Sequence, residues 1–396
     1  MICKQYLYGD ESDCKLQNQL NSMHSINRAP ICKVIKNGYI LPRIESPTAG
    51  SWGQGGVLKD DFSFVEESSD KWFGGKYIFD VNEVISTDFD VVFLGFLVPH
   101  WGIFLVDFLR RLYYLYDGDK KKKKLKIAFC GIGFDSGTFG GITEKCRSFF
   151  RLLDINDDDI IDVRTPMKFN TIYIPENGYE QDKYFFSTFL APFDYAVKKV
   201  RNENSHNGYL GSEKIYLSRT HFKQKKEAGE LIFERFFSDN GYLVLYPEEL
   251  EIEQQIEYFS HARVIASIEG SVAHNILFSN SNTRQIIIRK QHKYLNPRQY
   301  LFNEMKDSLV SYIDCYYEPF KHFPINYDIG PFLILFNKNI RAFAKDNGYQ
   351  YKKTFYIFNI MAAVRYFFLC IWQGALYVLY KKRKENVVSM LLRRWK

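Results

Sequence analysis

Apolar and polar positions follow two alternating spacings through the second half of the chain. Short apolar runs rich in β-branched and aromatic residues have the pattern of buried strands, and each is followed by apolar positions at helical spacing. This alternation predicts parallel strands joined by right-handed crossovers. The strand patterns cover 214–217, 242–246 and 263–268, and the helical patterns cover 226–237, 250–262 and 272–279.

A short polar motif ends each of these predicted strands. The carboxyl ends of parallel strands face one edge of a sheet, so the motifs should converge on one crevice, where open α/β sheets bind ligands. An arginine, two glutamates and a glycine before a helix predict a phosphorylated ligand bound without a metal, hence a nucleotide site. The motifs are Ser218-Arg219, Pro247-Glu248 and Glu269-Gly270-Ser271.

Each of these residue types has a role that its chemistry favours. The guanidinium fork of Arg219 suits a diphosphate, and an interdomain salt bridge is the alternative. Gly270 permits close backbone approach before the free N–H groups of a helix. Glu269 is an unfavourable neighbour for a phosphate, so a ribose or sugar hydroxyl is its expected partner. His274 and Asn275, one turn further on, either face the crevice or are buried with satisfied hydrogen bonds.

The first half has a weaker α/β pattern. Strands are predicted at 91–98, 126–130 and 171–174, a helix at 100–116, and an interdomain linker at 201–208. The expected organisation is a first domain over 1–205, a nucleotide-binding domain over 206–310 and a carboxyl-terminal extension over 311–396, and the resemblance described below makes these the acceptor-side and the nucleotide-sugar-binding domain.

His100 and Asp107 are the candidates for acid–base chemistry in this half. They are seven residues apart, nearly two helical turns, so both side chains share one face of the predicted helix. His100 stands at the helix start, on the carboxyl edge of the sheet. The alternative is structural: His100 caps the helix, and Asp107 pairs with Arg110 or Arg111.

Charge and cysteine content exclude several classes of function. The net charge is +7, with a run of five lysines at 120–124 and a basic end at 381–396, but no helix-turn-helix, zinc-finger or RNP-type pattern accompanies it. We therefore expect no nucleic-acid partner. The seven cysteines are dispersed without a C-x-x-C pair, and residues 1–21 lack an apolar core, which favours a cytoplasmic protein.

Two aspartate clusters resemble the D-x-D motif of metal-dependent sugar transferases. They are Asp117-Gly118-Asp119 and the run 157–159. A metal-binding pair should end a buried strand, whereas the first follows a helical pattern and the second suits a loop. We predict solvated turns at both and no metal.

The carboxyl-terminal extension contains an apolar stretch, 355–380, whose only charge is Arg365. Basic residues precede it at 352–353 and follow it at 381–384. A charge at mid-span costs about 2.5–3.5 kcal/mol on insertion scales. The prediction is an amphipathic helix lying on an anionic membrane surface, with a spanning helix and a core helix packed on the first domain as alternatives. The more polar half of its helical wheel holds Asn359, Arg365, Tyr366, Gln373 and Tyr377.

Five motifs, in this order, resemble glycosyltransferase family 61, in its bacterial branch tied to capsular polysaccharide synthesis. The similarity covers about 90–290. The motifs are H-W-G-x-F-L-V-D at 100–107, K-I-Y-L-S-R at 214–219, G-Y-L-V-L-Y-P-E at 241–248, E-Q-Q-I at 253–256 and I-E-G-S-V-A-H-N-I-L-F at 268–278.

The resemblance implies a GT-B fold, with two Rossmann-like domains facing across a cleft. It also implies an inverting, metal-independent transferase without a cofactor, which moves a sugar from a nucleotide-sugar donor to a glycan acceptor. The helix predicted at 355–380 adds the expectation that the acceptor is lipid-linked and that the enzyme is peripheral on the inner face of the cell membrane. Asp107 or His100 would be the base.

Two residues depart from the family pattern. Ile103 replaces a second histidine, and Glu269 stands where plant and animal members show His-Gly-Ala. The alternatives to an active transferase are a non-catalytic nucleotide-sugar-binding protein and a scaffold of a capsule assembly complex.

Overall fold

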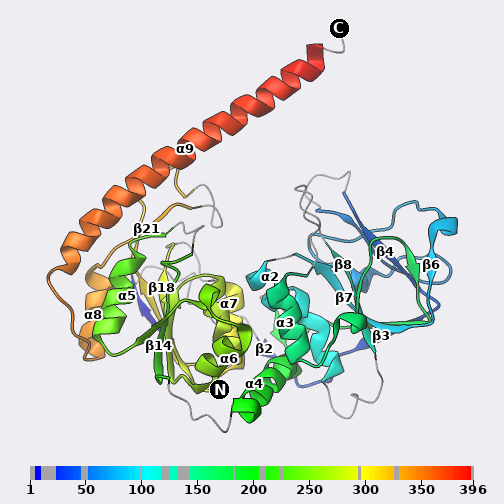
Figure 1. The fold of residues 1–396 in the computed structure, drawn as a ribbon, viewed down its shortest axis with the longest axis horizontal. Coiled ribbons are helices and arrows are strands. Elements are labelled where there is room, and N and C mark those ends of the chain that lie inside the picture. Colours follow the sequence, from blue (N-terminus) through cyan, green and yellow to red (C-terminus); the bar gives the residue numbers. More distant parts are fainter. Residues whose placement is uncertain are drawn as a thin grey trace.

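Two α/β units lie side by side in the computed structural model, with helix α4 (Ala191–Asn204) at their junction (Figure 1). Asp117, Asp119 and the lysine run 120–124 lie outside the described residues. The structure describes residues 5–9, 24–45, 52–98, 100–116, 125–131, 142–181, 183–204, 211–222, 227–292, 296–324 and 330–393.

The second unit is built on a six-stranded sheet in which every neighbouring pair is parallel. The parallel arrangement predicted from the alternating pattern is therefore confirmed. Helices cover both faces, which explains the nearly continuous apolar runs of the central strands (Figure 1). In spatial order the strands are β1 (Gln5–Tyr8), β19 (Val310–Asp314), β18 (Arg284–Arg289), β17 (Val264–Ile268), β14 (Lys214–Leu217) and β16 (Leu243–Leu245).

The helices of this unit form two layers around the sheet (Figure 1). The predicted helices at 226–237 and 250–262 are confirmed with small shifts of their ends, while 272–279 is a 3₁₀ helix. The layers are α5 (Glu230–Asp239) and α8 (Lys338–Asp346) on one face, and α6 (Ile252–His261), α7 (Pro297–Met305) and η8 (Ser271–Phe278) on the other, with η7 (Pro247–Glu249) before α6.

Both ends of the chain complete this unit, which corrects two predicted boundaries. β1 pairs in parallel with β19, so the first residues lie outside the first domain expected over 1–205. The boundary at 310 cuts through β19, because that strand fills the place between β18 and β1. A small sheet of β15 (Glu227–Ala228), β21 (Phe332–Ile334) and β20 (Tyr316–Tyr317) also joins residues of the expected extension to this unit.

The first unit has a mixed sheet that is parallel around β7 and antiparallel at one edge, where β3 pairs with β11. The predicted strands at 91–98, 126–130 and 171–174 are confirmed as β7, β8 and β11. The sheet order is β3 (Cys32–Lys36), β11 (Thr171–Pro175), β7 (Asp90–Leu97), β8 (Lys126–Gly131) and β9 (Ile160–Asp162), with further sheets of β5 (Gln54–Leu58), β4 (Tyr39–Ile44), β10 (Met167–Lys168) and β6 (Ile85–Ser86), and of β12 (Tyr179–Glu180), β13 (Tyr184–Phe185) and β2 (His24–Ser25).

The helical pattern predicted at 100–116 forms two consecutive pieces that meet at Asp107. The aspartate run 157–159 forms an exposed single turn, where Asp157 pairs with Arg147 at 2.9 Å. The helical segments of the first unit are η1 (Glu66–Ser68), η2 (Val81–Glu83), α2 (Trp101–Val106), η3 (Phe108–Leu115), α3 (Glu144–Leu152), η5 (Asp157–Asp159), η6 (Ser187–Leu190) and α4.

The two units share a continuous apolar core. Phe149 of α3 meets Phe278 of η8 edge-to-face, with ring centroids 5.7 Å apart. Phe189 of η6 stacks on Phe302 of α7 at 6.0 Å. An interface this apolar holds two domains in a fixed relation, whereas polar interfaces permit relative motion.

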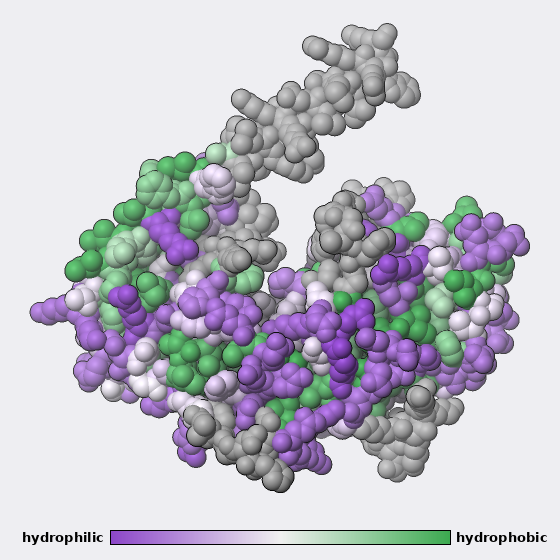
Figure 2. Space-filling model, viewed as in Figure 1, coloured by the Kyte–Doolittle hydropathy of each residue, from purple (hydrophilic) through white to green (hydrophobic). Residues whose placement is uncertain are grey.

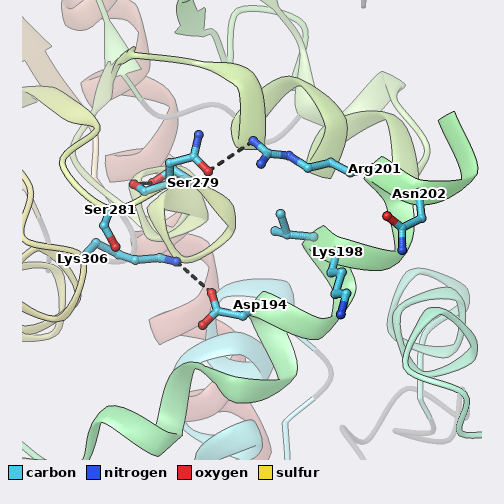
Figure 3. Close-up of a pocket in the computed structure, with 9 residues that line it drawn as sticks. Asp194, Lys198, Arg201, Asn202, Ser279, Ser281 and Lys306 are labelled. Carbon is cyan, nitrogen blue, oxygen red and sulfur yellow. Dashed lines mark hydrogen bonds and ion pairs between the residues drawn. The ribbon is translucent and has the colours of Figure 1, made fainter. Parts of the chain in front are cut away.

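Helix α4 extends into the predicted linker and is bound to the second unit. Arg201 donates a hydrogen bond to the carbonyl of Ser260. Residues 201–204 of the expected 201–208 linker belong to α4, and the remainder of that linker lies outside the described residues. A cavity of about 340 Å³ beside α4 contains the ion pair of Lys306 with Asp194, at 3.3 Å (Figure 3). Its lining is Asp194, Val197, Lys198, Arg201, Asn202, Ser279, Asn280, Ser281 and Lys306.

Helix α9 (Phe355–Arg393) is longer than the predicted 355–380 and projects beyond the body of the molecule (Figure 1). Its first turns pack on the second unit through the buried side chains of Phe355, Ala362, Tyr366 and Cys370. The alternative prediction placed a core helix on the first domain. That placement is wrong, because the helix packs on the second unit.

Candidate active site

The carboxyl ends of β14, β17 and β18 bring three residues together at one edge of the second sheet. Two of them, Arg219 and Gly270, were predicted from the sequence, and Lys290 was not. These strands are adjacent in the order β18-β17-β14, so the residues that follow them are neighbours. Arg219 follows β14, Gly270 follows β17, and Lys290 follows β18. The convergence expected from the parallel pattern is observed for Arg219 and Gly270.

Two cations stand over Gly270. A β-carbon placed on this glycine would lie 3.8 Å from Nη1 of Arg219 and 3.7 Å from Nζ of Lys290. The φ angle of Gly270 is +141°, a backbone conformation that a side chain disfavours. No side chain of Gly270 separates the start of η8 from the two cations, of which Arg219 is 21% exposed and Lys290 is 7% exposed.

Glu227 of β15 holds the two cations in place. Its Oε1 lies 3.6 Å from Nη1 of Arg219 and 3.3 Å from Nζ of Lys290, and its side chain is 3% exposed. Arg219 therefore pairs within its own unit, which corrects the alternative of an interdomain salt bridge. The Arg219 backbone is fixed as well, because its N–H donates to Oε1 of Glu230 at 2.8 Å.

Glu269 points into the unit, away from the edge where a ribose would bind. Its side chain is 2% exposed, and its Oε2 accepts the backbone N–H of Lys290 at 3.3 Å. Burial raises the pKa of this carboxyl, against the attraction of Arg289 and Lys290. The expected sugar-hydroxyl contact is therefore corrected: Glu269 fixes the backbone that carries Lys290.

Ser218 and Glu248 lie near the edge without facing Gly270. Ser218 is fully buried and donates to Oε2 of Glu234 at 2.6 Å, which orders the end of β14. Glu248 is exposed in η7 and faces Lys145 of the first unit. Burial lowers the pKa of Lys145 to about 8, and the charge of Glu248 opposes that shift.

His274 and Asn275 are buried in η8, as the structural alternative predicted. Nδ1 of His274 is 2.8 Å from Oε1 of Gln299, and Phe302 packs edge-on against the ring. Burial lowers the pKa of His274 to about 4, so the imidazole is neutral at pH 7. Neither residue contributes a side chain to the surface beside Gly270, which corrects their assignment to the donor site.

His100 and Ser271 both lie close to Gly102 at the junction of the two units. Gly102 of α2 packs so closely on η8 that a β-carbon there would lie 2.4 Å from Cβ of Ser271. The same point is 3.4 Å from Cε1 of His100. His100 is exposed at the start of α2, so the structure sets an imidazole from the first unit beside the residue that follows Gly270.

Asp107 is held in an ion pair between the units. Its Oδ1 accepts a hydrogen bond from Nη2 of Arg298 in α7 at 3.0 Å, with both side chains partly exposed. The partner is thus Arg298, whereas the sequence alternative named Arg110 or Arg111. Arg110 bonds to the Asp107 carbonyl, and Arg111 is buried against Glu67.

Sequence reasoning missed Lys290, Glu227 and Arg298. Lys290 had a usable signal, because it directly follows the apolar run 286–288 and Arg289, at the carboxyl end of a parallel strand like the other motifs. Glu227 lies in a two-residue strand with no pattern of its own. Arg298 becomes visible only when α7 is packed against α2.

Comparison with known proteins identifies one family over part of the chain. The model of the family Glycosyltransferase 61 matches residues 101–286, from the start of α2 into β18. The matched region includes Arg219 and Gly270. No curated protein matches the chain. The family match supports a glycosyltransferase activity in general and leaves the sugar and the acceptor open.

Proposed function

We propose that this protein is an inverting glycosyltransferase that moves a sugar from a nucleotide-sugar donor to a glycan acceptor. One observation carries the proposal: Arg219 and Lys290 flank Gly270 over the start of η8, and Arg219 and Gly270 lie inside the region that matches the family. Two fixed cations beside a backbone position without a side chain suit a diphosphate. The donor binds the second unit, and the acceptor approaches from the first.

His100 is the base in this proposal. It takes the proton from the attacking acceptor hydroxyl as the new bond from oxygen to the anomeric carbon forms. The bond from that carbon to the diphosphate breaks on the opposite face, which inverts the configuration. Asp107 fits this role less well because Arg298 already binds its carboxylate.

The departing nucleoside diphosphate gains negative charge, which Arg219 and Lys290 stabilise. Two cations preorganised by Glu227 need little reorganisation during the reaction. We therefore retain metal independence, and the absence of any cofactor, as part of the proposal. The GT-B arrangement is also proposed, and it is supported by two α/β units that meet where Gly102 packs on Ser271.

The acceptor proposed from the sequence resemblance is a lipid-linked glycan of capsular or other surface polysaccharide synthesis. Such an acceptor would place the enzyme on the cytoplasmic face of the cell membrane. A hexose and a pentose are both open as the transferred sugar. A non-catalytic nucleotide-sugar-binding protein, or a scaffold of a capsule assembly complex, would keep the same fold and release no nucleoside diphosphate.

The test combines binding and turnover. A panel of nucleotide sugars is screened for thermal stabilisation, since a ligand at 100 times its Kd stabilises by about 2.7 kcal/mol. Release of nucleoside diphosphate with acceptor extracts is then measured in excess chelator. We expect turnover, and a sugar product of inverted configuration. Binding without turnover would leave the non-catalytic protein, and activity restored only by Mn²⁺ or Mg²⁺ would refute metal independence.

Variants locate the activity at this edge. Arg219→Ala and Lys290→Ala should each weaken nucleoside diphosphate binding about 10- to 100-fold, the loss of one charged hydrogen bond. Arg219→Lys should restore part, since an ammonium lacks the bidentate fork. Arg263→Ala is the matched control, an exposed arginine before β17 at the opposite edge of the sheet. Wild-type diphosphate binding by both alanine variants would refute the site.

A further inference from the structure

Helix α9 has two apolar faces, and only one of them is covered. Phe355, Ala362, Tyr366 and Cys370 are buried against the second unit. On the other side large apolar side chains are 44–66% exposed, which Figure 2 shows as a hydrophobic band along the outer side of the helix. This outer band consists of Tyr356, Ile357, Ile360, Met361, Val364, Phe367, Phe368, Ile371 and Trp372.

We infer that the outer band of α9 binds an anionic membrane surface, with the helix lying in the plane of the bilayer. The biological role of this binding rests on the proposed function. The outer band would be the surface that brings the enzyme to a lipid-linked acceptor. The apolar side chains enter the boundary between headgroups and acyl chains, and neighbouring basic residues contact the headgroups.

The inner face is fixed to the protein by hydrogen bonds as well as by apolar contacts. Oδ1 of Asn359 accepts the N–H of Phe336 at 2.8 Å, and its Nδ2 donates to the Phe336 carbonyl at 3.0 Å. Tyr366 is buried on the same side. The sequence pattern placed this polar half toward water. The structure corrects that orientation for Asn359 and Tyr366, because both lie against the second unit, while Arg365 is exposed.

This attachment is incompatible with a spanning helix. By length and composition alone, one helix segment among the described residues, Phe355–Ala375, could cross a membrane, with a mean hydropathy of 1.6. Crossing would pull Phe355, Ala362 and Tyr366 out of the core of the second unit. It would also carry Arg365, which is exposed beside the band, into the hydrocarbon.

The width and chemistry of the band favour lipid over a second copy of the chain. At about 100° per residue the nine positions fall within an arc of about 160°, wider than the seam of a coiled coil. Their exposed area is on the order of 800 Å², above that of an ordinary surface patch. Four of the nine are aromatic, as at membrane interfaces.

Basic residues stand at both ends of the band. Lys353 precedes α9 and is exposed, and Arg365 lies along the band's margin. Four more basic residues, 381–384, follow in the sequence of the same helix. Each lysine or arginine near an anionic bilayer adds roughly 1 kcal/mol of attraction. This charge pattern fits acidic headgroups.

The same helix is connected to the donor edge, by which we mean the carboxyl edge of the second sheet with Arg219, Gly270 and Lys290. α9 packs on β15 and β21, and Ala362 lies against Gly229, directly after β15. β15 also carries Glu227, which holds Arg219 and Lys290. A membrane bound to the outer band therefore sets the orientation of the donor edge relative to the bilayer.

Vesicle co-sedimentation of the full chain tests the inference. We expect binding to vesicles of phosphatidylcholine with phosphatidylglycerol, weaker binding to pure phosphatidylcholine, and release by high salt. The double variant Ile360→Glu/Phe368→Glu should weaken binding about 100-fold or more, since two apolar side chains leave the interface. Ile78→Glu is the control, because Ile78 is 100% exposed in the first unit, away from α9.

Three outcomes would overturn the inference. They are an intact chain that stays soluble with anionic vesicles at low salt, resistance to alkaline carbonate, and a dimer in solution that the double variant dissociates. Nucleoside diphosphate binding by the double variant is measured in parallel and should equal that of wild type. Vesicle binding without any nucleotide-sugar binding would refute the proposed function and leave the membrane surface standing.

Discussion

Glu227 brings the residues of two separate strand ends together in the proposed anion site. Arg219 and Lys290 are 71 positions apart in the sequence, and a single buried carboxylate fixes both over Gly270. A carboxylate between two cations keeps them in place without a ligand, and each cation retains donors that can bind a diphosphate. The geometry of the proposed donor site therefore depends on a single residue, Glu227.

His100 and Asp107 should respond differently to substitution. We expect His100→Ala to lower turnover about 10²–10⁴-fold with little change in diphosphate affinity, because a base acts in the transition state. Asp107→Asn should lower stability more than it lowers turnover, because it weakens the ion pair with Arg298. Turnover and urea unfolding of both variants provide the measurements. A stable Asp107→Asn protein without turnover would make Asp107 the base.

His274 should make the protein sensitive to acid. Burial lowers its pKa to about 4, below the value of about 6.5 in the unfolded chain. Between these values only the unfolded chain binds the proton, so the free energy of unfolding falls as the pH falls. The contribution lost between pH 7 and pH 5 is about 2 kcal/mol.

Denaturant unfolding at both pH values measures this effect. His274→Asn cannot be protonated and keeps a donor for Gln299. It should therefore lose about 2 kcal/mol less than wild type on acidification. Equal losses in the two proteins would show that another group causes the acid sensitivity.

At the scale of elements, β15 and β21 connect the donor edge to α9, and Gly229 permits their close approach. Its φ angle is +109°, and a β-carbon there would lie 1.9 Å from the backbone oxygen of Ile334. Gly241 has a φ of +82° with no atom within 4 Å of that position. An alanine would therefore strain the backbone at both positions, and only at Gly229 would its β-carbon also clash with neighbouring atoms.

Gly229→Ala should therefore cost about 3 kcal/mol or more, from strain together with overpacking. Gly241→Ala should cost about 1 kcal/mol, from strain alone. Only the first should also weaken nucleoside diphosphate binding, because Glu227 precedes it by two residues. Thermal unfolding and diphosphate titration of both variants check this, and equal effects would remove β15 from the connection.

At the scale of the whole molecule, α9 is part of the folded core as well as a surface. A chain that ends after Ala375 keeps the contacts of Phe355, Ala362 and Tyr366, and it should melt close to the full chain. A chain that ends after Tyr351 loses them. Each large buried side chain contributes about 2–5 kcal/mol, so little of a stability of about 5–15 kcal/mol should remain. Circular dichroism melts compare the three chains, and unchanged melting of the shortest chain would contradict the packing of α9.

The sequence alone predicted the second unit better than the first. The strands at β14, β16 and β17 were predicted within two residues, since short apolar runs between helical patterns have few alternatives in a parallel sheet. The antiparallel edge of the first sheet and its additional small sheets were not predicted. Their strands are short, and their pairings join residues far apart in the chain.

The sequence by itself determined which residues stand at strand ends, because periodicity reports local geometry and burial. Arg219, Gly270 and His100 were found this way. Only the tertiary structure decided which side chains meet: Lys290 and Arg219 at Glu227, Asp107 and Arg298, β1 and β19, and the face of α9 that the second unit covers. The physical reason is that an apolar stripe must be buried and a buried charge must be paired, which the local sequence shows. Which residue is the partner depends on how elements distant in the sequence pack against each other.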